Sequence, residues 1–114
     1  MSEPVPVELR APVGARLLEI DWSDGTTSVY RHAILRGFCP CAHCQGHHGP
    51  IVWVEGAESA NLELTSIEEV GNYAVQLGWG DGHATGIYTF RYLRALAQVG
   101  EASVEEARTM RFAR

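Results

Sequence analysis

The chain has 114 residues, of which 46% are hydrophobic and 20% charged, proportions that are ordinary for one globular domain with a modest core. Its net charge of −5, with arginine supplying all nine basic residues, argues against a nucleic-acid-binding surface, because phosphate binding depends on clustered cationic side chains. Its apolar runs are too short for a membrane span and its first residues do not resemble a signal peptide, so we expect a cytoplasmic protein without a membrane partner.

The first half of the chain predicts an arm, a β-hairpin and a short helix. Residues 1–14 hold three prolines among charged and small residues and are predicted to be a mobile arm, with one domain over 15–114. Apolar and polar residues alternate from Ala15 to Trp22, which predicts a strand with one buried face. An Asp-Gly pair at 24–25 is typical of a tight hairpin turn. Thr26–Arg31 is therefore predicted to pair antiparallel with that strand, and His32–Gly37 to follow as a short helix or turn.

The second half predicts a strand, a second hairpin and two helices. The hairpin is indicated by Tyr73, Val75, Leu77 and Trp79, whose spacing of two places them on one face, and by a second Asp-Gly pair at 81–82. A capping-box pattern at 103–106 predicts the start of the last helix. The predicted strands are Leu62–Val70, 73–79 and Thr85–Tyr88, and the predicted helices are Phe90–Ala97 and a last one running toward Arg111.

The two hairpins share a sequence pattern that extends into the segments after them. This repetition predicts two similar hairpin-plus-helix units packed together about a pseudo-twofold axis. The arginine of the second copy, Arg94, is interpreted as a solvated helix residue. The first copy comprises Trp22, Asp24, Gly25, Val29, Tyr30, Leu35 and Arg36, and the second comprises Trp79, Asp81, Gly82, Ile87, Tyr88, Leu93 and Arg94.

All three cysteines of the chain lie within six positions, at Cys39, Cys41 and Cys44. They cannot all pair within one chain, and the first interval is too short for an unstrained disulfide. In a reducing compartment such clusters are typical of metal ligands, and thiolates from a short turn bind zinc or an iron–sulfur cluster. Pro40 favours a turn because it fixes its own φ and biases Cys39 away from helix. A thiol redox site is a weaker alternative, since no thioredoxin-like pattern surrounds these residues.

A tetrahedral site needs a fourth ligand, for which the histidines are the candidates. His43 is adjacent to Cys44, which makes it hard to aim both side chains at one ion. His47 lies at a Cys-x-x-His interval from Cys44, whereas His83 follows a Gly-Asp-Gly turn that would hold it rigidly. Spacing alone ranks His47 and His83 equally. Asp81 is interpreted first as a turn residue and second as a partner that orients His83.

Residues 35–44, 70–75 and 79–88 together resemble a known family, the small domain found at the N-terminus of gamma-butyrobetaine hydroxylase and its relatives. The resemblance covers about Arg16 to Leu96. The family also includes stand-alone bacterial proteins of unassigned function and domains appended to some iron–sulfur carrier ATPases. In the hydroxylases this domain binds zinc through a Cys-x-Cys-x-x-Cys turn and a later histidine. The resemblance therefore ranks His83 above His47 and implies the ligand set Cys39, Cys41, Cys44 and His83.

The same resemblance limits what is carried over. Many stand-alone members keep the Asp-Gly-His segment but lack the cysteines, so the presence of all four candidates favours the metal-binding branch. A non-haem iron oxygenase needs two histidines and a carboxylate, usually with a His-x-Asp pair, and this sequence contains no such pair. No nucleophile elbow is present either. Neither oxygenase activity nor another catalytic activity is expected.

These observations predict an α+β domain in which two β-hairpins form a small antiparallel sheet with short helices. A Cys3His metal site is expected to join the cysteine loop to the second hairpin. Because a closed set of four ligands is typical of structural zinc, we expect a zinc-binding structural or interaction module. The alternative is a protein that binds or transfers an iron–sulfur cluster. A protein partner is expected, and a homodimer is one alternative.

Overall fold

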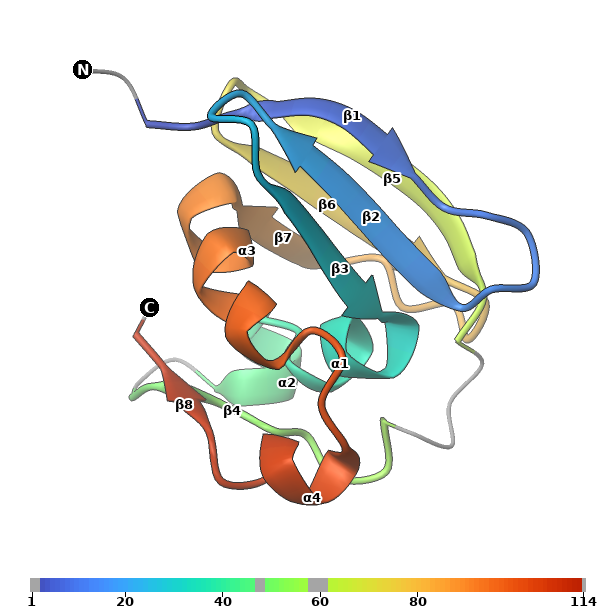
Figure 1. Ribbon diagram of the computed structural model, residues 1–114. Coiled ribbons are helices and arrows are strands. Elements are labelled where there is room, and N and C mark those ends of the chain that lie inside the picture. The colour runs from blue at the N-terminus through green and yellow to red at the C-terminus, as the bar shows by residue number, and fades with distance from the viewer. Residues whose placement is uncertain (1–2, 47–48, 58–61, 114) are drawn as a thin grey trace.

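The computed structural model describes residues 3–46, 49–57 and 62–113. Its strands are β1 (Pro6–Arg10), β2 (Leu17–Trp22), β3 (Thr27–Arg31), β4 (Ile51–Val52), β5 (Leu64–Val70), β6 (Ala74–Trp79), β7 (Gly86–Thr89) and β8 (Arg111–Phe112). Its α-helices are α1 (His32–Gly37), α2 (Ala42–Gln45), α3 (Phe90–Leu96) and α4 (Val104–Ala107). The strands form the antiparallel sheets β1-β2-β3 and β5-β6-β7 and the pair β4-β8. Helices α1 and α3 lie on one side of the larger sheets, with β4, β8 and α4 beyond them (Figure 1), so the predicted α+β fold is confirmed.

The middle strand of each larger sheet supplies much of the core. In β2 the alternate residues Leu18, Ile20 and Trp22 are at most 2% exposed, which confirms the predicted buried face. In β6 the residues Val75, Leu77 and Trp79 are buried as predicted, but Tyr73 is 53% exposed. Tyr73 departs from the pattern because it precedes β6 and stays in the turn that joins β5 to β6.

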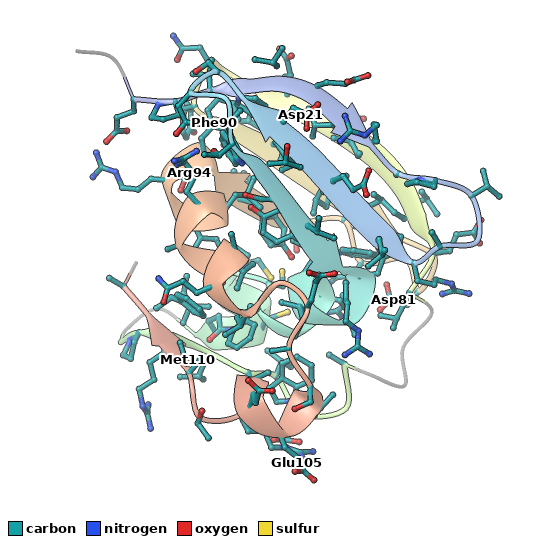
Figure 2. The ribbon with its side chains drawn as sticks, in the orientation of Figure 1. Asp21, Asp81, Phe90, Arg94, Glu105 and Met110 are labelled. Atoms are coloured by element: carbon teal, nitrogen blue, oxygen red, sulfur yellow. The ribbon has the colours of Figure 1, made fainter. Side chains whose placement is uncertain are left out.

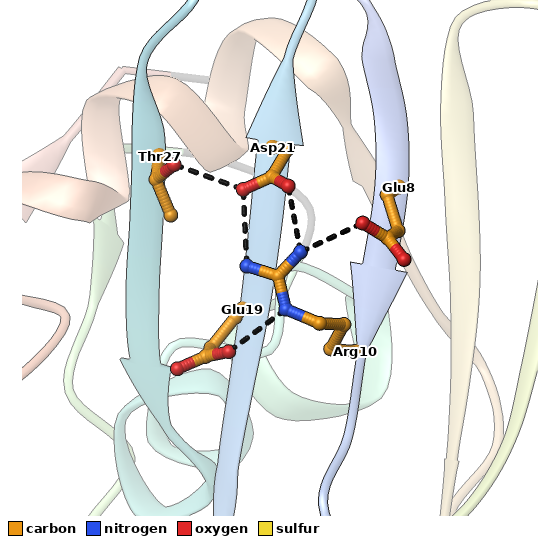
Figure 3. Close-up of polar contacts among 5 residues, drawn as sticks. All are labelled: Glu8, Arg10, Glu19, Asp21 and Thr27. Atoms are coloured by element: carbon orange, nitrogen blue, oxygen red, sulfur yellow. Dashed lines mark hydrogen bonds and ion pairs between the residues drawn. The ribbon is translucent and has the colours of Figure 1, made fainter.

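The predicted mobile arm over 1–14 differs from the structure, in which Pro6–Arg10 form β1 and pair with β2. Pro6 is tolerated because it is the first residue of an edge strand, where a missing amide donor costs little. On the exposed face, Arg10 donates to both carboxylate oxygens of Asp21 at 2.6 and 3.0 Å and to Glu19 at 3.0 Å (Figure 3). These hydrogen bonds hold the pKa of Asp21 down at about 2. Exposed ion pairs contribute little, so backbone pairing and apolar contacts hold the strand.

The C-terminal region begins as predicted and ends differently. The Ser103 hydroxyl caps α4 by accepting a hydrogen bond from the Glu106 amide at 3.2 Å. The helix ends at Ala107 and does not run to Arg111, because the chain turns to bury Phe112 in β8. The Phe112 ring packs edge-on against Phe38 with 5.2 Å between centroids. Within the described ranges, no helix is long and apolar enough to cross a membrane.

The predicted repetition is confirmed as two units, residues 6–37 and 64–96, each with three strands followed by a helix. In each unit, one buried tyrosine hydrogen-bonds to the helix of the other unit. The Tyr30 hydroxyl in β3 donates to the Leu93 carbonyl of α3 at 2.6 Å. The Tyr88 hydroxyl in β7 donates to the Leu35 carbonyl of α1 at 2.5 Å. Because these contacts are reciprocal, the two units pack as related halves.

Two ion pairs follow the same reciprocal rule. Arg36 of the first unit pairs with Asp81 of the second, and Arg94 of the second pairs with Asp24 of the first. Arg94 and Asp81 lie at opposite ends of the strands in the view of Figure 2. Arg94 was expected to be solvated, yet its guanidinium also lies 5.0 Å from the centroid of the Trp22 ring. The repeated Asp-Gly turns are therefore held by arginines from the opposite unit.

Aromatic rings complete this symmetry. Phe90 packs edge-on against Trp22 at 6.4 Å, and His32, the residue at the corresponding place in the first unit, packs edge-on against Trp79 at 5.4 Å. His32 is only 5% exposed, and its Nδ1 lies 2.7 Å from the Leu62 carbonyl oxygen. Burial lowers the pKa of His32. His32 is therefore part of the packing between the units.

Candidate metal centre

The cysteine loop leaves the end of α1 and runs into α2. Cys39 follows Phe38 directly, Cys41 is the N-cap of α2 in an extended conformation, and Cys44 lies inside α2. The amide of Cys44 donates to the carbonyl of Cys41 at 3.2 Å, so the single helical turn brings both side chains to the same side. Cys39 lies just before α2, and its sulfur reaches the same cluster.

Gln45 fixes this loop to the rest of the domain. Its side-chain amide donates to the carbonyl of Cys39 at 3.1 Å and to the carbonyl of Val52 at 2.8 Å. Its side-chain oxygen accepts a hydrogen bond from the amide of Val52 at 3.0 Å. The loop is thereby attached to β4, which limits the movement of the cysteines.

His83 comes from the turn between β6 and β7. Gly82 has a φ of +87°, a conformation that glycine adopts without the steric cost other residues incur. The Asp81 carboxylate accepts a hydrogen bond from the His83 amide at 2.9 Å, and the His83 carbonyl accepts one from Trp79 at 2.9 Å. Asp81 is therefore the turn residue that was predicted, and it positions His83 through the backbone.

The four side chains converge on one point. The Nε2 atom of His83 lies 3.2 Å from the sulfur of Cys39, 3.5 Å from that of Cys41 and 3.6 Å from that of Cys44. All four candidate donor atoms lie within 4.8 Å of one another. Ligand atoms around a tetrahedral zinc ion, with Zn–S of about 2.3 Å and Zn–N of about 2.0 Å, are separated by about 3.5–3.8 Å. The donor set and its spacing therefore fit a zinc-sized ion.

The surroundings of Cys39 leave room for its sulfur and little more. Cys39 is fully buried, whereas Cys41, Cys44 and His83 are partly exposed. A Cβ atom on Gly86 would lie 2.8 Å from the Cys39 sulfur, so the lack of a side chain at this position in β7 makes space for the thiol. The corresponding residue of the first unit is Ser28. The centre is thus closed on the Cys39 side and open toward solvent on the other.

The three thiols differ in how readily they ionise. Burial raises the pKa of Cys39, and burial together with the adjacent Cys41 raises the pKa of Cys44. Burial also opposes ionisation of Cys41, but hydrogen bonding from Thr85 and the neighbouring Cys44 lowers its pKa below the usual value. Three thiolates this close together repel one another, so a bound cation is what would allow all three to be ionised.

The structure brings together all four residues that the resemblance implied, and it shows one contact that sequence reasoning missed. His47 and the side chain of His43 lie outside the described residues. The missed residue is Arg36, whose Nη1 lies 3.7 Å from the Cys44 sulfur and whose Nε lies 3.2 Å from Asp81 Oδ2. The repeated Leu-Arg pattern was the available signal, because it placed Arg36 and Arg94 at matching positions.

The comparisons with known proteins identify the family and similar folds. The model of the family described as "Gamma-butyrobetaine hydroxylase-like, N-terminal" matches residues 9–94. A crystal structure of a protein of unknown function from Acidithiobacillus ferrooxidans, of the DUF971 family, is 41% identical with a TM-score of 0.68, covering 84% of this chain and 98% of that one. An NMR solution structure is 31% identical with a TM-score of 0.67 and covers 85% of this chain and 71% of the other. No curated protein matches the sequence.

These matches carry the assignment because the family model spans well over half of the chain and because the first solved structure is similar along nearly its whole length. They do not assign an activity, since that relative is itself described as having unknown function. The chain belongs to the gamma-butyrobetaine hydroxylase-like N-terminal domain family.

Proposed function

We propose that the protein is a zinc-binding structural and interaction module. The observation that carries this proposal is the convergence of three cysteine sulfurs and one imidazole nitrogen within 4.8 Å of one another. Four such donors complete the shell of a tetrahedral zinc ion and leave no position for a substrate or water. Bound zinc would supply a cross-link and no catalysis.

The cross-link would join parts of the chain that are distant in sequence. Cys39 and His83 are 44 positions apart; Cys39 follows directly after the first unit, and His83 lies in the second. Holding the loop after α1 against the turn after β6 stabilises the folded state, because the unfolded chain offers no preformed site. The protein's own residues contribute the preformed geometry, through Gln45 on the loop and Asp81 on the turn.

The second candidate is an iron–sulfur cluster bound for storage or transfer. It is favoured by the exposure of the centre, since only Cys39 is fully buried while Cys41, Cys44 and His83 remain partly exposed. A cluster held at a partly exposed centre can be transferred to another protein. In both cases the partner is a protein, and in neither does the oxygenase chemistry of the hydroxylases apply.

Elemental analysis of protein purified without a nickel-affinity step tests the proposal. We expect about one zinc per chain and no visible absorption, because four donors in this arrangement fit one tetrahedral ion. Brown protein that contains iron and acid-labile sulfide would instead establish the cluster. Protein that contains neither zinc nor iron, after expression with both metals supplied, would contradict both proposed functions.

The fourth ligand is tested by comparing His83→Ala with His47→Ala. We expect His83→Ala to lose most of the bound metal, because its Nε2 lies within 3.6 Å of all three sulfurs. His47→Ala serves as the matched control and is expected to keep its metal. The opposite outcome, with metal lost from the His47 variant alone, would identify His47 as the ligand.

A further inference from the structure

We propose that Arg36 is a positioning residue of the metal centre, an inference that rests on the proposed metal-binding function. Its Nη1 lies 3.7 Å from the sulfur of Cys44, and its Nε lies 3.2 Å from Asp81 Oδ2. Asp81 in turn accepts the hydrogen bond from the His83 amide at 2.9 Å. One guanidinium therefore connects a ligand in α2 to the turn that carries the histidine.

The location of Arg36 suits this role. The side chains of Arg36 and Asp81 are 14% and 22% exposed, so their ion pair is better shielded from solvent than the exposed pairs of this protein. Three thiolates, a neutral imidazole and a divalent ion carry one net negative charge, which a donor on the Cys44 sulfur helps to disperse. The rigid fork of a guanidinium can hold two partners at once, whereas a lysine ammonium offers a single point of charge.

The other unit provides an internal comparison. There Arg94 pairs with Asp24 at 2.8 Å and reaches the Thr26 hydroxyl at 3.4 Å, and Asp24 accepts a hydrogen bond from the Thr26 amide at 3.0 Å. The arginine, the aspartate and the turn are thus common to both units. Thr26 stands where the second unit has His83, and Arg94 reaches a hydroxyl where Arg36 reaches a sulfur. A role confined to closing the turn would make the two arginines equivalent.

The test compares Arg36→Met, Arg36→Lys and Arg94→Met in the full chain. Zinc affinity is measured by competition with a chromophoric chelator, and the cobalt–thiolate bonds are followed by the absorption of the cobalt-substituted protein. We expect Arg36→Met to weaken zinc binding by about 10–100-fold, with Arg36→Lys recovering little of it and Arg94→Met staying within about threefold of the unmodified protein. The sulfur-to-cobalt charge-transfer band is expected to shift in the two Arg36 variants and not in Arg94→Met.

Equal zinc affinities and unchanged cobalt spectra for Arg36→Met and Arg94→Met would overturn the inference and leave Arg36 a structural residue. An unmodified protein that binds no zinc would contradict the proposed function itself, so the two failures are distinguishable. If Arg36→Met does not fold, Arg36→Gln and its counterpart Arg94→Gln repeat the comparison with a polar side chain. Weaker zinc binding in Arg36→Gln than in Arg94→Gln supports the inference, and equal binding overturns it.

Discussion

Replacing Cys39 with alanine is expected to abolish stable metal binding and to lower the free energy of unfolding of the metal-loaded protein by about 4 kcal/mol, the contribution of a ligand present at about 1,000 times its Kd. For a domain of this size that loss corresponds to a Tm lower by roughly 15–30 °C. Cys39 is the ligand with the largest expected effect because it is fully buried and lies 3.2 Å from His83 Nε2. Metal analysis and thermal unfolding followed by circular dichroism measure both consequences.

The metal-free forms provide the control for this substitution. Without metal, Cys39→Ala loses only the packing of one sulfur. The Tm difference between the variant and the unmodified protein is therefore expected to be much smaller without metal than with it. The difference between the loaded and the metal-free comparisons isolates the contribution of the metal. Equal losses of stability with and without metal would show that Cys39 is only a core residue.

Gly100→Ala is expected to give a large loss of stability at a position away from the metal centre. Gly100 has an ordinary helical conformation, and its carbonyl accepts a hydrogen bond from the Arg31 amide at 2.7 Å. A Cβ atom at this position would lie 2.0 Å from the backbone oxygen of Val29. Because backbone in a paired strand cannot rotate away, we expect a loss of about 3 kcal/mol or more, measured by urea-induced unfolding.

Gly78→Ala is the matched comparison for Gly100→Ala. Its Cβ atom would lie 2.3 Å from the Ser66 hydroxyl, which belongs to a side chain that can change rotamer. We therefore expect a smaller loss of about 1 kcal/mol. A Gly100 variant as stable as the Gly78 variant would show that β3 can move away from the segment after α3.

The parts of the fold that depend on local signals were predictable from the sequence. The alternation of Leu18, Ile20 and Trp22 and the Asp-Gly pairs at 24–25 and 81–82 identified both hairpins, because strand burial and turn geometry are set by neighbouring residues. The capping box at Ser103 identified the start of α4 for the same reason.

The missed elements depend on partners that are distant in sequence. β1 has a short apolar alternation interrupted by proline, and only its pairing with β2 makes it a strand. β8 has two residues and exists because β4, about 60 positions earlier, accepts it. Sequence patterns depend only on the residues of the segment itself, so they do not predict strands that form only by pairing with a distant segment.

The residues of the candidate site were likewise predictable only in part from the sequence. The spacing of the cysteines indicated a metal, and the resemblance to a zinc-binding domain ranked His83 above His47. The contact between Arg36 and Cys44 depends on the packing of α1 against the turn of the other unit, so it could be seen only in the folded chain. The repeated pattern nevertheless marked Arg36 and Arg94 as a pair, and the structure explains why one of them contacts the cluster.

The most direct test of this account is X-ray absorption spectroscopy at the zinc edge of the purified protein. One ion that joins the cysteine loop to the second hairpin predicts three sulfur neighbours at about 2.3 Å and one nitrogen neighbour at about 2.0 Å, with the imidazole signal lost in His83→Ala. A shell of oxygen neighbours alone, or an imidazole signal that persists unchanged in His83→Ala, would contradict it.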